Sequence, residues 1–300
     1  MRLGKLRRRQ GGVIDRRGQG SGFGFGAGSS LPGGRGGLGV GLVVLVLVLI
    51  FGGTQLLGGD GGGGISDVLG PFGDTSAVQP GSSDTQVDPD DPAGDFVDAV
   101  ADDVQVTWID LFERSDLTYE ETSVVLFDGA TSSGCGRASS ATGPFYCPAD
   151  RLVYIDLEFF RELERRFGAP GDFAQAYVIA HEIGHHVQNL LGIDAQVARQ
   201  TRADPSRTND LSIRLELQAD CFAGVWGRAA QGAGILEPGD LEEGMAAAAA
   251  VGDDRIQEAT TGRIDPESWT HGSSEQRTTW FRTGFQIGNP DACDTFSQDL

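Results

Sequence analysis

The feature that most constrains the fold of this chain is the hexapeptide His-Glu-Ile-Gly-His-His at residues 181–186. It contains His181, Glu182 and His185 in the order His-Glu-x-x-His, a short motif typical of zinc sites on helices. Four residues are slightly more than one helical turn, so both imidazoles project from one face and Glu182 leans over the open coordination position. The motif therefore predicts a helix that binds Zn²⁺ and uses Glu182 as a general base on water.

A catalytic zinc site needs a third protein ligand and keeps one position open for water. The metzincin arrangement would place glycine at 188 and histidine at 191, but these positions hold Gln188 and Leu191, which excludes that class. A glutamate from a downstream helix is the other frequent solution. Glu216 follows His185 by 31 residues, and we expect it to be the third ligand.

Asp220 lies four residues after Glu216 and therefore on the same face of a helix. Its carboxylate is expected to accept the free ring N–H of a ligand histidine and to fix the tautomer, as in gluzincin-type sites. A solvated helix surface is the alternative interpretation of Asp220. His186 projects about 100° away from His185 around the helix, so we assign it to packing or to a supporting contact.

The remaining histidine, His271, lies in the segment 268–277, far from the motif in sequence. Zinc hydrolases often supply a donor for the developing oxyanion from outside the metal helix, and His271 or Arg277 could serve. Ser273 or Ser274 as a helix N-cap explains the local serines without any chemistry. A catalytic and a structural role for His271 are equally open at this stage.

Glycine and charge divide the chain into unlike parts. The first 97 residues hold 27 of the 46 glycines, so we expect little of this stretch to fold. Residues 1–37 carry a net charge of +7, whereas the remainder carries −27. Because a strongly acidic domain repels phosphate, the composition argues against nucleic acid as a partner.

An apolar, uncharged stretch at residues 38–57 is about as long as a helix needs to be to cross a bilayer. We expect a single transmembrane helix here; a cleaved signal peptide is the competing interpretation, but no small-x-small cleavage site follows. The positive-inside rule then predicts a basic cytoplasmic segment at 1–37 and a catalytic domain outside the cytoplasmic membrane. Residues 58–94 read as a flexible linker rich in Gly and Asp, and residues 95–300 as one domain.

The four cysteines fit an oxidising compartment, where disulfides are more plausible than free thiols. Three pairings are possible. We prefer Cys135 with Cys147, which closes a short loop, and Cys221 with Cys293, which attaches the C-terminal tail to a helix. The spacings lack a Cys-x-x-Cys pair, so a cysteine-bound structural zinc is not expected.

Apolar periodicity and stop signals predict helices over 95–115, 156–167, 173–191, 210–231, 238–250 and 275–285. β-branched and aromatic residues predict a strand at 152–156, which we place at a sheet edge facing the cleft. Gly184 lies inside the metal helix and indicates close packing near the site. The expected fold class is α+β, mainly helical with a small β-sheet.

These residues resemble the putative neutral zinc metallopeptidase family of bacterial single-pass membrane proteins. The matching motifs are Val-Ile-Asp-Arg-Arg-Gly at 13–18, Gly-Pro-Phe-Tyr-Cys-Pro at 143–148, Val-Tyr-Ile-Asp at 153–156, the hexapeptide at 181–186, Glu-x-x-x-Asp-Cys at 216–221 and Thr-His-Gly at 270–272. The resemblance covers most of residues 98–296, and the two metal motifs are the specific ones. It implies a zincin-like metallopeptidase fold but says little about substrate.

The expected function is that of a membrane-anchored zinc metallopeptidase that hydrolyses peptide or protein substrates. A peptide could lie extended along the strand at 152–156 and use its backbone hydrogen bonds. The main alternative is a membrane-tethered binding or assembly protein in which zinc only stabilises the fold. A hydrolase of non-peptide amides would share every residue named above. The sequence does not indicate an oligomeric state.

Overall fold

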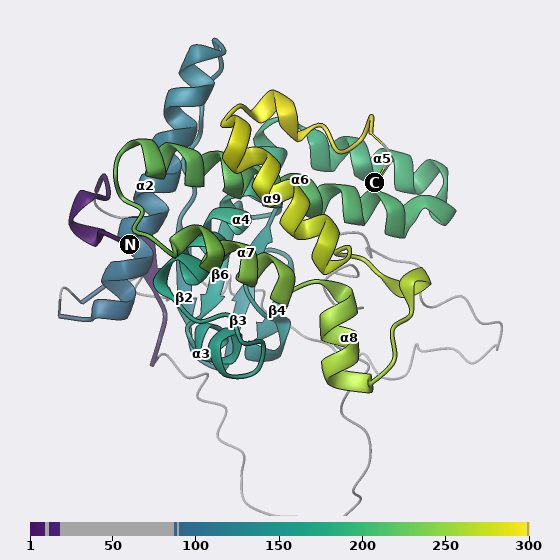
Figure 1. The fold of residues 1–300 in the computed structure, drawn as a ribbon, viewed down its shortest axis with the longest axis horizontal. Helices are drawn as coiled ribbons and strands as arrows, with labels where there is room; N and C mark the ends of the chain where they lie inside the picture. The colour runs from purple at the N-terminus through teal and green to yellow at the C-terminus, as the bar shows by residue number, and fades with distance from the viewer. Residues whose placement is uncertain (10–11, 19–86, 89, 299) are drawn as a thin grey trace, which may run out of the picture.

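The computed structural model describes residues 1–9, 12–18, 87–88, 90–298 and 300. In these residues a small sheet is covered on one face by packed helices (Figure 1). The α-helices are α2 (Pro92–Arg114), α3 (Glu158–Arg165), α4 (Asp172–Leu190), α5 (Ile193–Ala203), α6 (Thr208–Gly232), α7 (Asp240–Ala250), α8 (Asp253–Thr261) and α9 (Ser274–Ile287). The strands are β1 (Val13–Asp15), β2 (Val124–Phe127), β3 (Ala130–Ser133), β4 (Gly136–Ser139), β5 (Phe145–Cys147) and β6 (Leu152–Asp156). Short 3-10 helices are η1 (Leu3–Lys5), η3 (Ser140–Thr142), η4 (Pro205–Arg207), η5 (Pro266–Ser268) and η6 (Pro290–Cys293). The fold is α+β and mainly helical, as the periodicity predicts.

The main sheet has the strand order β1-β2-β6-β5. β1, β2 and β6 run parallel, and β5 pairs with β6 in the antiparallel direction. The strand predicted at 152–156 is therefore present as β6, but its expected place at a sheet edge is wrong. β6 lies between β2 and β5, so β5 and not β6 forms the edge of the sheet. The connection between β5 and β6 is short, and β6 therefore turns back to pair with β5 in the antiparallel direction.

The two faces of the sheet are both apolar and pack against different elements. Alternate residues of the strands, Val124, Leu126, Val153 and Ile155, join the large core formed with the helices. Their neighbours Val125, Phe127 and Tyr154 pack in a second cluster with Phe145, Cys147 and Ala138 of the hairpin β3–β4. The period of two along each strand explains why one sheet serves both clusters.

Three helices carry most of the predicted site residues, and glycines set how closely these helices approach one another. A Cβ on Gly184 of α4 would lie 3.1 Å from the carbonyl oxygen of Ala219 on α6. A Cβ on Gly284 of α9 would lie 1.9 Å from the carbonyl oxygen of Cys221, so no other residue fits there. Figure 1 shows α9 lying against α6, with α4 beyond it. The close packing expected at Gly184 is present.

Each predicted helix is found with shifted ends, but α5 and α8 were not predicted. Both are short and carry few buried residues, with Val197 the buried apolar residue of α5. A helix of nine to eleven residues with a weak apolar face gives little periodicity to detect. Both helices are held by the elements around them rather than by their own sequence pattern.

Residues 1–9 and 12–18 lie on the domain, which differs from the expectation of a separate basic segment ending at 37 and a domain beginning at 95. Strand β1 pairs with β2, and Met1, Leu6 and Val13 join the large core. In Figure 1 this segment, drawn in purple, runs beside α2. Sequence composition missed it because a three-residue strand among arginines and glycines has no periodicity of its own.

The apolar stretch at 38–57 and almost all of the linker at 58–94 fall outside the described residues. Among the residues that the structure does describe, no helix combines the length and apolar character needed to cross a membrane. Both preferred disulfides are present. Cys135 and Cys147 join with a Cα–Cα distance of 5.8 Å, and Cys221 and Cys293 with 5.6 Å.

Candidate metal centre

The three residues predicted as metal ligands converge at the junction of α4 and α6. His181 Nε2 lies 3.2 Å from one Glu216 carboxylate oxygen, and His185 Nε2 lies 3.6 Å from the other. Ligand atoms around a tetrahedral zinc, each about 2.0–2.2 Å from the ion, are about 3.3–3.6 Å apart. The three groups therefore lie at a spacing that fits one zinc ion, although α4 and α6 contribute them from positions 31 or more residues apart.

The second nitrogen of each ligand histidine is already engaged. His181 Nδ1 lies 2.9 Å from an Asp220 carboxylate oxygen, and His185 Nδ1 lies 2.8 Å from Gln188 Oε1. Because both partners accept hydrogen bonds, each Nδ1 carries a proton and donates it, which leaves Nε2 as the nitrogen that can face a metal. Once Nε2 of His181 has lost its proton, the donor set has the tautomers that zinc requires.

Gln188 is a functional residue that sequence reasoning missed, since its position was used only to exclude metzincins. Its amide nitrogen donates to the carbonyl oxygen of Leu215 at 2.8 Å and to Gln218 Oε1 at 3.1 Å. These two acceptors fix the amide so that Oε1 faces His185. The signal available in the sequence is the i,i+3 spacing from His185, which places both side chains on one helix face.

Asp220 is fully buried, as a partner of a ligand histidine should be, and not on a solvated surface. Besides His181 it accepts hydrogen bonds from the Tyr177 hydroxyl and from Arg277, whose Nε and Nη2 lie 2.8 and 2.9 Å away. Arg277, on α9, also donates to the carbonyl oxygen of Val251. The oxyanion role considered for Arg277 is therefore not what the structure favours, because its guanidinium is committed to holding Asp220.

Two glutamates at the centre have opposite electrostatic environments. Burial raises the pKa of Glu216, but His185 and His181 outweigh it and hold that pKa well below its usual range, so the ligand stays anionic. Burial raises the pKa of Glu182, which is 7% exposed, and His181 and His185 offset only part of the rise. A carboxylate with a raised pKa accepts a proton more readily, which suits a general base.

His271 lies beside the centre in the turn before α9, held by Asp253. Nδ1 of His271 is 3.1 Å from one Asp253 oxygen, while the other oxygen accepts the backbone N–H groups of Thr270, His271 and Gly272. Burial lowers the pKa of His271, but Asp253 and the charge of Glu216 raise it more, so the net shift is upward. The ring is therefore oriented by Asp253 and its pKa lies above the ordinary value, and Asp253 is a partner that the sequence did not indicate.

His186 points away from the centre, as its position on the helix predicts. Its ring is fully buried and contacts the Tyr146 hydroxyl at 3.1 Å and the carbonyl oxygen of Glu120 at 2.6 Å. Burial lowers its pKa, so it is a neutral packing residue. It joins α4 to strand β5.

Zinc affinity should rise with pH because a proton occupies the metal position of His181. Burial lowers the pKa of His181, but the carboxylates of Asp220 and Glu216 outweigh it and raise that pKa to about 9. Since zinc binds the neutral ring, one proton must leave, and affinity is expected to increase about tenfold per pH unit between about pH 7 and 9. Competition with a chelating dye measures this; an affinity that stays constant or falls over that range contradicts it.

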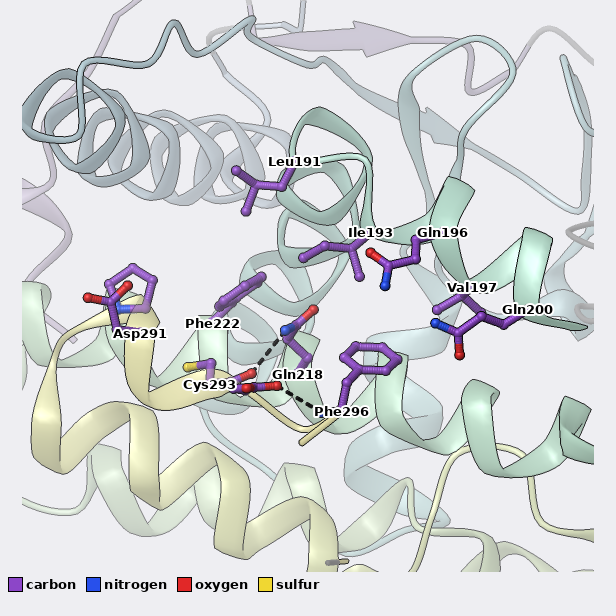
Figure 2. A pocket seen from close by; sticks show the side chains of 12 residues that line it. Leu191, Ile193, Gln196, Val197, Gln200, Gln218, Phe222, Asp291, Cys293 and Phe296 are labelled. Atoms are coloured by element: carbon purple, nitrogen blue, oxygen red, sulfur yellow. Dashed lines mark hydrogen bonds between the residues drawn. The ribbon is translucent and has the colours of Figure 1, made fainter. Parts of the chain in front are cut away.

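A hollow of about 440 Å³ is lined by residues of α5, α6 and η6 and by none of the three ligands (Figure 2). Its wall includes Gln218 and Phe222, which are offset by about 200° around the helix from Glu216 and Asp220. Figure 2 shows Gln218 donating to the backbone oxygen of Cys293 at the base of the hollow. The hollow is distinct from the metal centre, and Gln218 joins the two through Gln188.

Comparison with known proteins gives one family and several relatives. The model of the family described as "Putative neutral zinc metallopeptidase" matches residues 1–296. An uncharacterized protein of Escherichia coli K12, YpfJ, is 50% identical over 212 residues, which cover 70% of this chain and 74% of that protein. Uncharacterized proteins of Mycobacterium tuberculosis and Mycobacterium bovis are 45% identical over 261 residues, covering 81% of this chain and 85% of theirs. No solved structure matches the chain.

Proposed function

Because this chain belongs to the family described as putative neutral zinc metallopeptidases, we propose that its domain is a zincin-type peptidase that hydrolyses peptide bonds with zinc. The observation that carries the proposal is the convergence of His181, His185 and Glu216, with both Nδ1 atoms engaged elsewhere. A structural zinc site is closed by four protein ligands, whereas a catalytic one has three and an open position. In the described part of the chain this group offers three.

Glu182 is the proposed general base. Zinc bound by the three ligands supplies Lewis-acid chemistry, which makes water a nucleophile near neutral pH. Glu182 directly follows His181 on α4 and is not among the three ligands, so its carboxylate is available to accept a proton from the attacking water. The same carboxyl group then returns the proton to the leaving amine nitrogen, which completes acid–base catalysis with one residue.

His271 is proposed to stabilise the oxyanion that forms on the substrate carbonyl. Its replacement by alanine is expected to lower kcat by about 10²–10³-fold, while KM and zinc content change little. Asp253→Asn should also lower kcat, because the ring loses the carboxylate that raises its pKa and orients it. Steady-state kinetics with zinc analysis check this. An unchanged kcat for His271→Ala would leave His271 with a structural role alone.

The sheet edge at β5 is the proposed place for the substrate backbone. β5 is the terminal strand of the sheet beside β6 in the described residues, so its outer side is where an extended peptide would pair with the sheet. Tyr146 of β5 contacts His186 on the metal helix, which keeps this edge next to α4. This placement replaces the earlier expectation of pairing along β6, which already has neighbours on both sides.

We also propose that the domain works outside the cytoplasm and at the membrane. Two disulfides support an oxidising compartment, since cytosolic thiols are kept reduced. The apolar stretch at 38–57 supports membrane attachment, with peptide or protein substrates reached outside the cytoplasmic membrane.

Removal and return of zinc test the proposed activity directly. The purified full chain is expected to contain about one zinc per molecule and to cleave members of a peptide library. Dialysis against a chelator should abolish cleavage, and one equivalent of zinc should restore it, because water that is not bound to zinc is too weak an acid for Glu182 to deprotonate efficiently. Cleavage that continues at the same rate without metal would overturn the proposal.

A further inference from the structure

The N-terminal residues form an outer strand of the catalytic domain. β1 lies parallel to β2 in the register Val13↔Val124, Ile14↔Val125 and Asp15↔Leu126. Two backbone hydrogen bonds frame the pairing, from Val124 N to Gly12 O at 2.7 Å and from Arg16 N to Leu126 O at 2.8 Å. β2 is fully buried, so without β1 an apolar strand would become an exposed sheet edge.

A buried carboxylate of the domain depends on this segment for its positive partner. Asp103 of α2 is completely buried, and its Oδ1 lies 2.7 Å from Arg7 Nε. The guanidinium of Arg7 also donates to the carbonyl oxygen of Asp103 and to Thr107 Oγ1. The other oxygen of Asp103 accepts the indole N–H of Trp226. Because an unpaired buried charge is costly, the domain and Arg7 are expected to fold together.

Three other basic residues of the segment pair with acidic groups of the domain. Arg8 pairs with Asp95, Arg9 with Glu121 at 3.1 Å, and Arg17 with Asp91 at 2.5 Å. The positive-inside rule counts such charges as anchors on the cytoplasmic side. Here their partners are carboxylates of the domain itself.

The ion pair between Arg17 and Asp91 also brings together the two ends of the stretch 19–86. Residues 17 and 91 are in direct contact although 74 positions separate them. Parallel pairing of β1 with β2 and the Arg7–Asp103 contact require residues 1–18 and the domain to lie on the same side of a membrane.

We propose that residues 1–18 share one compartment with the catalytic domain, as its outermost strand and the counter-charge of Asp103. The expectation of an N-terminus on the opposite side of the membrane is thereby replaced. The inference does not rest on the peptidase activity, since it uses only the sheet and the ion pairs.

Lys5 makes a direct test possible, because it is the only lysine in the chain and is exposed. Spheroplasts that produce the full chain are treated with a membrane-impermeant amine-reactive ester, and mass spectrometry locates the label at residue 5. In the same sample, trapping of free thiols shows whether the four cysteines are disulfide-bonded, which reports the compartment of the domain. Lys5→Arg keeps the charge and removes the amine, so it is the matched control.

Labelling of Lys5 from outside together with disulfide-bonded cysteines is the expected result. Protection of Lys5 with all cysteines reduced also supports a shared compartment, on the inner side. Protection of Lys5 with bonded cysteines, or labelling with reduced cysteines, overturns the proposal, provided that permeabilised cells show Lys5 to be reactive.

Hydrogen exchange of the full chain tests whether residues 1–18 are packed on the domain. Arg7→Glu is expected to speed exchange of the Val124 amide at least about tenfold, because the hydrogen bond to Gly12 opens when Arg7 is lost. Lys5→Glu makes the same charge change at an exposed position and should leave that rate unaltered. Equal exchange rates in Arg7→Glu and the unmodified chain would overturn the proposal that Arg7 holds residues 1–18 on the domain. If Arg7→Glu does not fold, the labelling of the unmodified chain still decides the proposal.

Discussion

Replacement of Glu182 by glutamine is expected to abolish peptide hydrolysis while zinc stays bound at about one ion per chain. Glutamine has the same shape but cannot accept a proton from water, and general acid–base catalysis contributes about 10²–10⁴-fold. Zinc stays because Glu182 is not among the three converging ligands. Measurement of kcat/KM on a library-derived peptide, with metal analysis of the same preparation, gives both quantities.

Glu162→Gln is the matched control, since it makes the same chemical change on the exposed face of α3. It should leave both rate and zinc content unchanged. A Glu182→Gln protein that hydrolyses peptides at the normal rate would remove this centre as the catalyst. If that variant keeps zinc and the full biological activity of the chain, the alternative of a zinc-stabilised binding or assembly protein is favoured instead.

Asp220→Ala is expected to lower the free energy of unfolding of the metal-free protein by about 3–5 kcal/mol, because it leaves Arg277 buried without its charge partner. The zinc affinity of the folded fraction should also fall about 10–100-fold, since His181 loses the acceptor that fixes its tautomer. Urea denaturation measures the first effect and dye competition the second.

The difference in unfolding free energy between the unmodified chain and Asp220→Ala should persist near neutral pH and become smaller only in acid. Burial raises the pKa of Asp220, but Arg277 and His181 lower it more, so the net pKa lies below the ordinary 3.8. A group with a lowered folded pKa stabilises the fold above its ordinary pKa and loses that contribution as pH falls through the folded value. Unfolding curves for both proteins at several pH values test this. An equal loss of stability at all pH values, including acid, would contradict it.

Two further variants separate the ion pair from the other contacts of Asp220. Arg277→Ala alone should also destabilise strongly, whereas the double variant Asp220→Ala/Arg277→Ala should lose less than the sum of the two, because no unpaired charge remains. Glu158→Ala breaks the surface ion pair with Arg161 and should leave the denaturation midpoint in place. Additive losses at Asp220 and Arg277 would show that their mutual attraction is not what stabilises the site.

Long periodic segments and the metal motifs were predictable from sequence. The helices α4 and α6 carry both an apolar pattern and the ligands, so each local signal agreed with the fold. Spacing placed Glu216 and Asp220 on one face of α6, and the structure puts both at the centre. Both preferred cysteine pairings are present, although spacing alone left three open.

Short elements and long-range partners were not predictable. α5 and α8 are too short for periodicity to detect, and strand order, which moved β6 from the edge to the interior, depends on pairing between distant segments. Gln188 and Asp253 support the histidines only because neighbouring turns bring them within hydrogen-bonding distance. Composition assigned residues 1–18 to a separate segment, because a count of charges does not show that the arginines form ion pairs with carboxylates of the domain.

The sequence by itself determined which side chains could bind a metal ion and activate water. These are two imidazoles one turn apart, a neighbouring base, and two carboxylates one turn apart on another helix. Helical spacing is a local property of the backbone, so these faces follow without knowledge of the rest. Only the tertiary structure decided that the two faces meet, that Arg277 rather than solvent neutralises Asp220, and that the N-terminal strand completes the sheet. Those outcomes depend on burial and on contacts between residues that are tens of positions to more than a hundred positions apart, which no local pattern encodes.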